Sequence, residues 1–403
     1  MPSQTGPVGG RRRAFTLVEL LLVIVIIAVL ISILVPALGG AREAARKAQT
    51  ATLLRTLGNA TMTFGNDHEG QAPGLFSVAD MGHSENGGTS NSGGEGMSAM
   101  ENLILGLSGS DAILGINDAN YNGETSNTIV ALVGPRSAPM SKYYVNPSLI
   151  GSGGAYFEIP KEFFVAQTRS ESQISGPGPA STEDERANGM VEIPDLVDAW
   201  GQPILAWVKN EYGSSSIRQS ASNIDLEREK FAQVDSDGAM DDNASPAWFY
   251  WNSNAAFLRS QALGKKREDM TQDPGMYEGA TSALGSFLAD NHPEKLYRTM
   301  AALLGSTAVP TLQDASGTAY MSKDVIPTAA RAKVVLQSAG RDGIYLSSRD
   351  PGLANATDDR DFVDYGSDFY IPGTSNRITD DKGKPTSTDV IQEFDDIVQG
   401  AGS

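Results

Sequence analysis

The chain has 403 residues, with 31 Lys and Arg against 49 Asp and Glu, for a formal net charge of −18. This acidic balance argues against nucleic acid as a partner, because phosphate binding requires clustered basic side chains. The lack of Cys excludes a disulfide scaffold, a thiolate zinc site and a cysteine nucleophile. The motifs of common hydrolases, P-loop NTPases and dinucleotide-binding folds are also missing. We therefore expect a protein that is not an enzyme.

The strongest feature of the sequence lies near its start: an uncharged apolar run of 19 residues from Leu20 to Leu38. As a helix it would span about 28 Å, close to the thickness of a bilayer's hydrocarbon core. Arg11, Arg12 and Arg13 stand before it, and the positive-inside rule places that side in the cytoplasm. The run is too long for a secretory signal peptide and leads into an Ala-rich helix instead of a cleavage site. We predict a membrane-spanning helix with most of the chain exported.

One ionisable residue, Glu19, lies directly against this run. A charged side chain near hydrocarbon is costly and marks a functional position whose partner must be identified. The segment from Arg11 to Ala14, followed by Phe-Thr-Leu-Val-Glu-Leu, resembles the cleavage and methylation motif of type IV prepilins. The resemblance implies cleavage between Ala14 and Phe15 by prepilin peptidase, and then methylation of the Phe15 amine. The family usually has Gly at the position of Ala14.

This resemblance implies a filament subunit in which Glu19 has a specific partner. Cleavage creates a cationic amine on Phe15, and in a bundle of such helices the Glu19 carboxylate can pair with the Phe15 amine of a neighbour. That pairing would set the register between subunits. Pro36 removes one backbone hydrogen bond, and it stands where pilin-like helices often carry a proline that unwinds during assembly. The alternatives are an accidental Glu at the membrane edge and a proline that a bilayer helix merely tolerates.

The helix is expected to continue beyond the membrane as an amphipathic segment, because apolar residues recur there every three or four positions. A cluster of Gly, Asn and Asp should end it. We expect an α+β fold: a long N-terminal helix packed on an antiparallel β-sheet, pilin-like, with large loop and helix insertions. The predicted parts are residues 1–14 (leader), 15–66 (helix, with a membrane half at about 15–38 and an amphipathic half at about 41–64) and 67–403 (periplasmic globular domain, with insertions at about 71–190 and 210–330).

Two later segments combine a turn with a strand-like run. Residues 198–203 read Asp-Ala-Trp-Gly-Gln-Pro and precede an apolar run to Val208, and residues 338–343 read Ser-Ala-Gly-Arg-Asp-Gly after the strand-like run 332–337. This pair resembles segments of the major pseudopilin of type II secretion. In that family these segments form the antiparallel sheet that packs on the helix and the loop that follows. The alternative is two ordinary turns, since Asp-Gly is common in hairpins.

The C-terminal loop of that family binds calcium, and the same resemblance implies a Ca²⁺ site here. Carboxylate and carbonyl oxygens on a flexible loop are the ligands that Ca²⁺ requires. Asp342, Asp358 and Asp359 are the candidate ligands among six Asp residues between positions 342 and 364. Their spacing is longer than in the family. A solvated acidic surface is the alternative.

Together these features predict a pseudopilin subunit of a type II secretion system, processed by prepilin peptidase and assembled into a short periplasmic filament that drives protein export. Its partners would be prepilin peptidase, other pseudopilins in a helix-bundle filament, the inner-membrane assembly platform and membrane lipid. It would cross the inner membrane once, with the N-terminus cytoplasmic and the C-terminal domain periplasmic. Two alternatives stay open: a minor pilin of a type IV pilus, and a membrane-anchored binding or enzymatic domain on a pilin-like anchor. The large part after the helix favours a minor or tip position.

Overall fold

The computed structural model divides into two compact units, Met1–Ala48 and Gln49–Ser403, which are described separately. The residues that the structure describes are 17–74, 98–114, 129–133, 141–145, 155–157, 164–165, 178–179, 191–192, 195–209, 249, 293–313, 316–343, 345–346, 363–371 and 374–402. All statements below on contacts, clusters and absences concern these residues.

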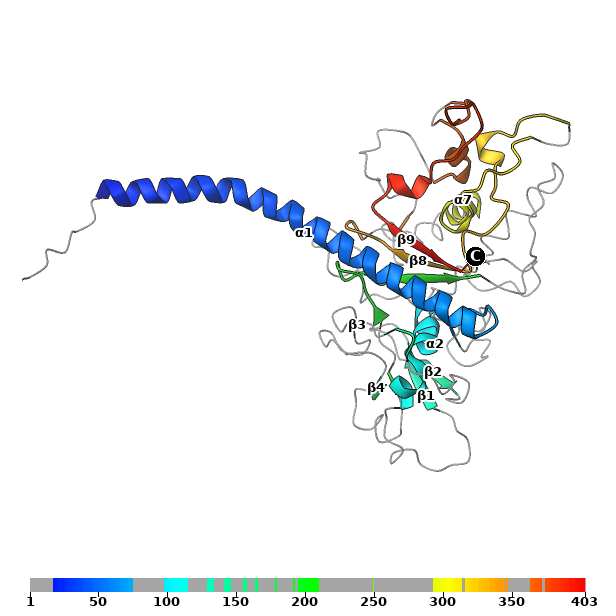
Figure 1. Ribbon diagram of the computed structural model, residues 1–403, viewed down its shortest axis with the longest axis horizontal. Helices are drawn as coiled ribbons and strands as arrows, with labels where there is room; N and C mark the ends of the chain where they lie inside the picture. The colour runs from blue at the N-terminus through cyan, green and yellow to red at the C-terminus, as the bar shows by residue number, and fades with distance from the viewer. Residues whose placement is uncertain are drawn as a thin grey trace, which may run out of the picture. The chain divides into compact units, whose positions relative to one another are not determined.

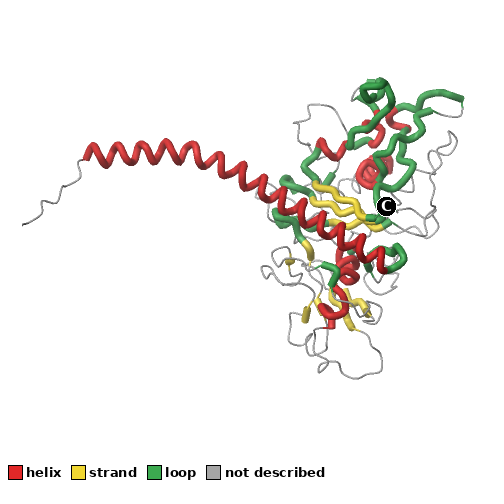
Figure 2. The backbone as a smooth tube through the Cα atoms, in the orientation of Figure 1, coloured by secondary structure: helices red, strands yellow, loops and turns green. Residues whose placement is uncertain are grey.

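A single helix, α1 (Leu17–Asp67), begins in the first unit and ends in the second. It is the long helix of Figure 1 and is continuous in Figure 2. At its end the Gly70 N–H donates to the Gly65 carbonyl at 2.6 Å, and Glu69 and Gly70 both have positive φ, of 54° and 85°. A positive φ together with a backbone hydrogen bond back to the last turn is typical of helix C-termini, where glycine is favoured. The predicted helix and its stop at the Gly-rich cluster are confirmed.

The second unit is built on a three-stranded antiparallel sheet in the order β7-β8-β9. The strands are β7 (Leu205–Val208), β8 (Val334–Ser338) and β9 (Ile397–Ala401). The central strand β8 is buried along its whole length and is mostly apolar, as expected for a strand covered on both faces. The predicted strands before residue 208 and before residue 338 are therefore confirmed, and they pair with each other.

Two further helices contribute to the core around this sheet. In α2 (Ala99–Leu114) the Ser98 hydroxyl caps the Glu101 N–H at 3.2 Å, and the Glu101 carboxylate accepts from the Ser98 N–H at 2.6 Å. This reciprocal capping box fixes where the helix begins. The buried apolar residues of α2 and of α7 (Pro293–Leu304) join those of α1 in one cluster. Both helices fall within predicted insertions, yet they form part of the core.

The other elements are short. A four-stranded sheet has the order β2-β1-β5-β4, and a two-stranded sheet pairs β3 with β6. Among the described residues of the C-terminal third of the chain there are three 3₁₀ helices. The bounds are β1 (Ile129–Val133), β2 (Ser141–Val145), β3 (Phe164–Val165), β4 (Gly178–Pro179), β5 (Val191–Glu192), β6 (Asp195–Leu196), η6 (Ser322–Asp324), η7 (Tyr365–Phe369) and η8 (Val390–Glu393). The fold is α+β and pilin-like, as the sequence predicts: a long apolar N-terminal helix followed by a small antiparallel sheet.

Candidate functional site

The first half of α1 exposes apolar side chains on every face. The large aliphatic side chains between Leu17 and Leu38 are all exposed, from 47% for Val23 to 80% for Leu17. By length and composition this stretch can cross a membrane. A surface this large and apolar is not stable in water, so lipid or other apolar helices must cover it.

Glu19 is the only ionisable residue in that stretch of α1. It lies in the first turn of the helix, where the helix dipole favours a negative charge. Ala14 and Phe15, on either side of the predicted cleavage point, lie outside the described residues. The pairing of Glu19 with a neighbour's Phe15 amine therefore stays a prediction.

Helix α1 passes through Pro36 without interruption. Proline has no N–H to donate to the carbonyl four residues earlier, so this turn has one helical hydrogen bond fewer. Gly39 and Gly40 follow three and four residues later, and a Cβ added to either would meet no atom within 4 Å. The stretch from Pro36 to Gly40 thus combines a missing helical hydrogen bond with two residues of low helix propensity. Because the helix is intact here, unwinding at Pro36 stays a prediction about assembly.

The second half of α1 buries one stripe against the sheet. Leu54, Leu57 and Phe64 recur at helical spacing and are buried, which confirms the predicted amphipathic pattern. Gly58 brings the helix close to β9, because a Cβ added there would lie 3.4 Å from Cγ of Gln399. The sheet and this half of α1 are therefore one packed body.

The pairing of β7 with β8 brings the two pseudopilin-like segments together. Residues 198–203 precede β7 and residues 338–343 follow from the end of β8. The Ser338 hydroxyl donates to Oδ2 of Asp198 at 2.6 Å, across 140 positions of sequence. Both segments therefore form one junction at the same end of the sheet.

Asp198 is the centre of this junction. Its Oδ1 accepts from the backbone N–H groups of Trp200 and Gln202, both at 2.9 Å, so the carboxylate shapes its own turn. The next residue, Ala199, donates its N–H to the Thr50 hydroxyl of α1 at 3.1 Å. The junction thereby connects both turns and the helix.

Burial raises the pKa of Asp198 to about 6, against the opposing effect of the Ser338 hydroxyl and the backbone donors. The side chain is only 3% exposed. At neutral pH the carboxylate is mostly ionised, and it is held by hydrogen bonds instead of a cationic side chain.

The second turn depends on Gly340, which has a φ of 66°. A Cβ at this position would lie 2.3 Å from the backbone oxygen of Asp395, so only glycine fits. Two residues later, the Asp342 N–H donates to Oδ2 of Asp395 at 2.9 Å. The Gly and Asp of this segment therefore hold the loop against the chain that enters β9.

The calcium prediction is only partly covered by the structure. Asp342 lies in the junction, whereas Asp358 and Asp359 lie outside the described residues. Among the residues that the structure describes, no group of three or more His, Asp or Glu side chains has the arrangement of a metal site. Calcium binding therefore stays a prediction.

A series of hydrogen bonds connects three buried side chains at the sheet and was not predicted from the sequence. Trp207 Nε1 donates to Oε1 of Gln337 at 3.0 Å, and Gln337 Nε2 donates to Oδ2 of Asp396 at 2.7 Å. All three side chains are buried, so each polar group needs a partner. The one signal in the sequence is Gln337 itself, a polar residue at the end of an apolar strand.

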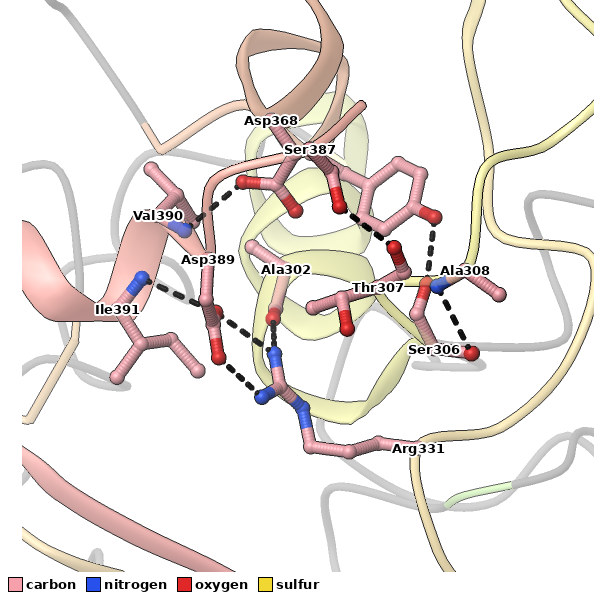
Figure 3. Close-up of polar contacts among 11 residues, drawn as sticks. Ala302, Ser306, Thr307, Ala308, Arg331, Asp368, Ser387, Asp389, Val390 and Ile391 are labelled. Carbon is pink, nitrogen blue, oxygen red and sulfur yellow. Dashed lines mark hydrogen bonds and ion pairs between the residues drawn. The ribbon is translucent and has the colours of Figure 1, made fainter. Parts of the chain in front are cut away.

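A second unpredicted network surrounds Arg331 (Figure 3). Its two terminal nitrogens contact the two carboxylate oxygens of Asp389 at 2.5 and 3.0 Å, and one of them also donates to the carbonyl of Ala302 in α7. Asp389 in turn accepts from the Ile391 N–H at 3.3 Å, at the start of η8. A two-point contact of this kind is geometrically specific. It connects α7, the chain before β8 and η8.

Asp368 lies beside this network and is 1% exposed. Its Oδ1 accepts from the Val390 N–H at 2.9 Å, and among the described residues its Oδ2 has no hydrogen-bond partner. Burial and, next, the charge of Asp389 raise the pKa of Asp368 to about 8. The side chain therefore keeps its proton in most molecules at neutral pH. The local sequence Tyr-Gly-Ser-Asp-Phe resembles an ordinary polar turn and gives no sign of this.

Comparison with known proteins bears on the N-terminal helix alone. The prokaryotic N-terminal methylation motif matches residues 10–35, a range that includes Ala14, Phe15 and Glu19. No curated protein and no solved structure matches the chain. The match covers the start of the apolar helix that the structure leaves exposed. The chain therefore carries a type IV pilin-like prepilin motif, which marks it as a substrate of prepilin peptidase.

Proposed function

We propose that the chain is a pseudopilin of a type II secretion system, cleaved between Ala14 and Phe15 and assembled through α1 into a short periplasmic filament. Its work is mechanical and not enzymatic. The filament grows as subunits leave the inner membrane, and its growth pushes cargo outward. The observation that carries this proposal is the exposed apolar half of α1 directly behind a methylation motif.

The sheet junction supports secretion over a pilus. The Asp-x-Trp-Gly-x-Pro and Ser-x-Gly-x-Asp-Gly segments, which resemble those of the major pseudopilin, contact each other through Asp198 and Ser338. The same junction is attached to α1 through Thr50. The two segments that carry the pseudopilin resemblance thus meet in one junction, which supports the proposal.

In the proposed filament, cleavage removes Arg11, Arg12 and Arg13 and leaves a methylated amine on Phe15. The mature chain then has 28 basic and 49 acidic side chains, a net charge of −21. Glu19 pairs with the Phe15 amine of a neighbour, and lipid contacts of the helix are exchanged for helix contacts. A pair that satisfies both charges away from water is far more stable than either charge alone.

The first test is the intact mass and N-terminal sequence of the protein expressed with and without prepilin peptidase. We expect an N-methylated chain beginning at Phe15 when the peptidase is present. A chain that still begins at Met1 would contradict the proposal and leave a simple membrane anchor.

The assembly step is tested by Glu19→Ala, with Glu43→Ala as a matched control on the same helix. We expect Glu19→Ala to insert and to be cleaved normally but not to enter filaments, whereas Glu43→Ala assembles. Cross-linking between copies, followed by electron microscopy, measures the difference. Normal assembly of Glu19→Ala would refute the charge pairing.

A minor pilin of a type IV pilus is the second candidate, because pilins and pseudopilins share the N-terminal motif. In either system, the 355 residues after Ala48 form a large unit. So large a unit favours a tip or minor position over a repeating one. Deletion of the gene distinguishes the candidates: a pseudopilin is required for export of the secreted proteins, and a minor pilin for surface pili.

A further inference from the structure

Basic side chains cluster on α1 directly after its apolar run. Arg42, Arg46 and Lys47 all lie within nine residues of Leu38. Arg42 and Lys47 are exposed, and the side chain of Arg46 is 34% exposed and lies 3.4 Å from the Glu43 carboxylate. Even with Glu43 counted, residues 39–48 have a net charge of +2. Arg42, Arg46 and Lys47 are called the basic patch below.

The helix geometry places the basic patch at the depth of lipid headgroups. If Leu38 ends the apolar span, Arg42 lies about 6 Å beyond it and Lys47 about 14 Å beyond it. The headgroup layer extends roughly 5–8 Å past the hydrocarbon. Side chains on a helix tilt towards its N-terminus, which here is the membrane side. The long Arg46 and Lys47 side chains can therefore extend back to the phosphates.

The basic patch lies on one side of the helix. Arg42 and Arg46 are four residues apart and share a face, and Lys47 lies about 100° further round. Three exposed alanines lie on the opposite side: Ala41, Ala44 and Ala48. One side of α1 can therefore bind anions while the other side stays narrow enough for a close helix contact.

The rest of the chain is strongly acidic. Six of the 31 basic and two of the 49 acidic side chains lie in residues 1–48, so residues 49–403 have 25 basic and 47 acidic side chains, a net charge of −22. An anionic membrane surface repels this unit. The basic patch is the positive charge nearest the apolar run, and it opposes that repulsion where the chain leaves the membrane.

We propose that the basic patch binds the phosphate groups of anionic phospholipids on the face of the membrane from which the globular unit emerges. The inference rests on the proposed function, since it requires α1 to span the bilayer. Its continuity with the apolar run favours lipid over a protein partner. Cleavage removes the three arginines before the run, so the basic patch is then the main basic contact of α1 with lipid.

The test uses the full chain in vesicles that mix phosphatidylcholine with phosphatidylglycerol. Native mass spectrometry counts the phosphatidylglycerol molecules retained per chain after extraction. The wild type should be enriched in phosphatidylglycerol. In the triple variant Arg42→Gln, Arg46→Gln, Lys47→Gln this enrichment should be lower by a factor of at least about five, which is the effect of one basic residue near an anionic surface. The enrichment should also fall as salt is raised.

A matched control removes three exposed basic residues elsewhere, with Arg55→Gln, Lys382→Gln and Lys384→Gln, and should leave the enrichment unchanged. Equal enrichment in the wild type and the basic-patch variant overturns the inference. The inference is also overturned if the basic-patch variant loses cross-links between copies but keeps its lipid enrichment. The partner of the basic patch would then be the acidic unit of a second copy. A chain that inserts into vesicles without discriminating lipids refutes only this inference, whereas a chain that fails to insert refutes the proposed function too.

Discussion

The two halves of α1 belong to one continuous helix and meet opposite surroundings. From Leu17 to Leu38 every large aliphatic side chain is exposed, whereas Leu54, Leu57 and Phe64 are buried against the sheet. The second half is stabilised within the chain, by apolar packing and by the Asp198 junction. The large aliphatic side chains of the first half are exposed, so lipid or neighbouring copies must cover them. Folding and assembly are therefore assigned to different segments of the same element.

The sharpest test of this difference is a pair of matched truncations, Leu57→Ala and Leu30→Ala. Leu57→Ala should lower the free energy of unfolding of the globular unit by about 2–5 kcal/mol, because it leaves a cavity in the core. Leu30 is 53% exposed, so its truncation should change that free energy by less than about 0.5 kcal/mol. Urea unfolding followed by tryptophan fluorescence measures both. Similar losses would mean that the first half also packs on the globular unit.

The raised pKa of Asp368 predicts that the free energy of unfolding of the second unit depends on pH. Its folded pKa of about 8 lies above the unfolded value of 3.8, so the native state binds the proton more tightly. The free energy of unfolding should therefore fall as pH rises from about 4 to about 8, by on the order of 3–5 kcal/mol. Asp368→Asn should remove the slope between about pH 6 and about pH 8, whereas Asp198, with a folded pKa of about 6, still contributes below that range. The exposed Asp381→Asn is the control, and an unchanged slope in Asp368→Asn would refute the assignment.

The junction hydrogen bond is tested by Ser338→Ala against Ser32→Ala. Ser338→Ala leaves the buried Asp198 carboxylate without one donor, and should cost about 1–3 kcal/mol. Among the described residues, the Ser32 hydroxyl donates to the Val29 carbonyl of its own helix, at 2.7 Å, so its loss should leave the unfolding of the globular unit unchanged. Denaturant midpoints give both values. An equal effect of the two changes would argue against the junction as a tertiary contact.

The smallest expected effect is a gain from Gly58→Ala. A Cβ at Gly58 would make ordinary van der Waals contacts of 3.4 to 3.8 Å with β9, and alanine favours the helix. The free energy of unfolding should rise by about 0.5–1 kcal/mol. Gly40→Ala, in open surroundings, should leave it unchanged. A loss at Gly58 would show that α1 packs on the sheet more tightly than these contacts allow.

Much of the fold could be predicted because the signals are local. The end of α1 follows from the backbone freedom of Gly70, and the apolar runs that became β7 and β8 stand directly beside recognisable turns. The two segments that contain Asp198 and Ser338 are predicted to form one sheet and its loop because both resemble the same family, but the contact between these two side chains is not predicted. In contrast, α2 lies inside a predicted insertion, and only packing shows that it belongs to the core.

The sequence by itself determined that this chain has a prepilin motif, an apolar helix of membrane length and a stripe that packs on a sheet, because periodicity and composition act over neighbouring residues. The tertiary structure alone decided how distant polar groups meet. Arg331 and Asp389 are 58 positions apart, and Gln337 and Asp396 are 59 apart. The environment of Asp368 depends on charges and burial supplied by other segments. Such contacts are selected by the desolvation cost of each buried group, and no local pattern encodes that cost.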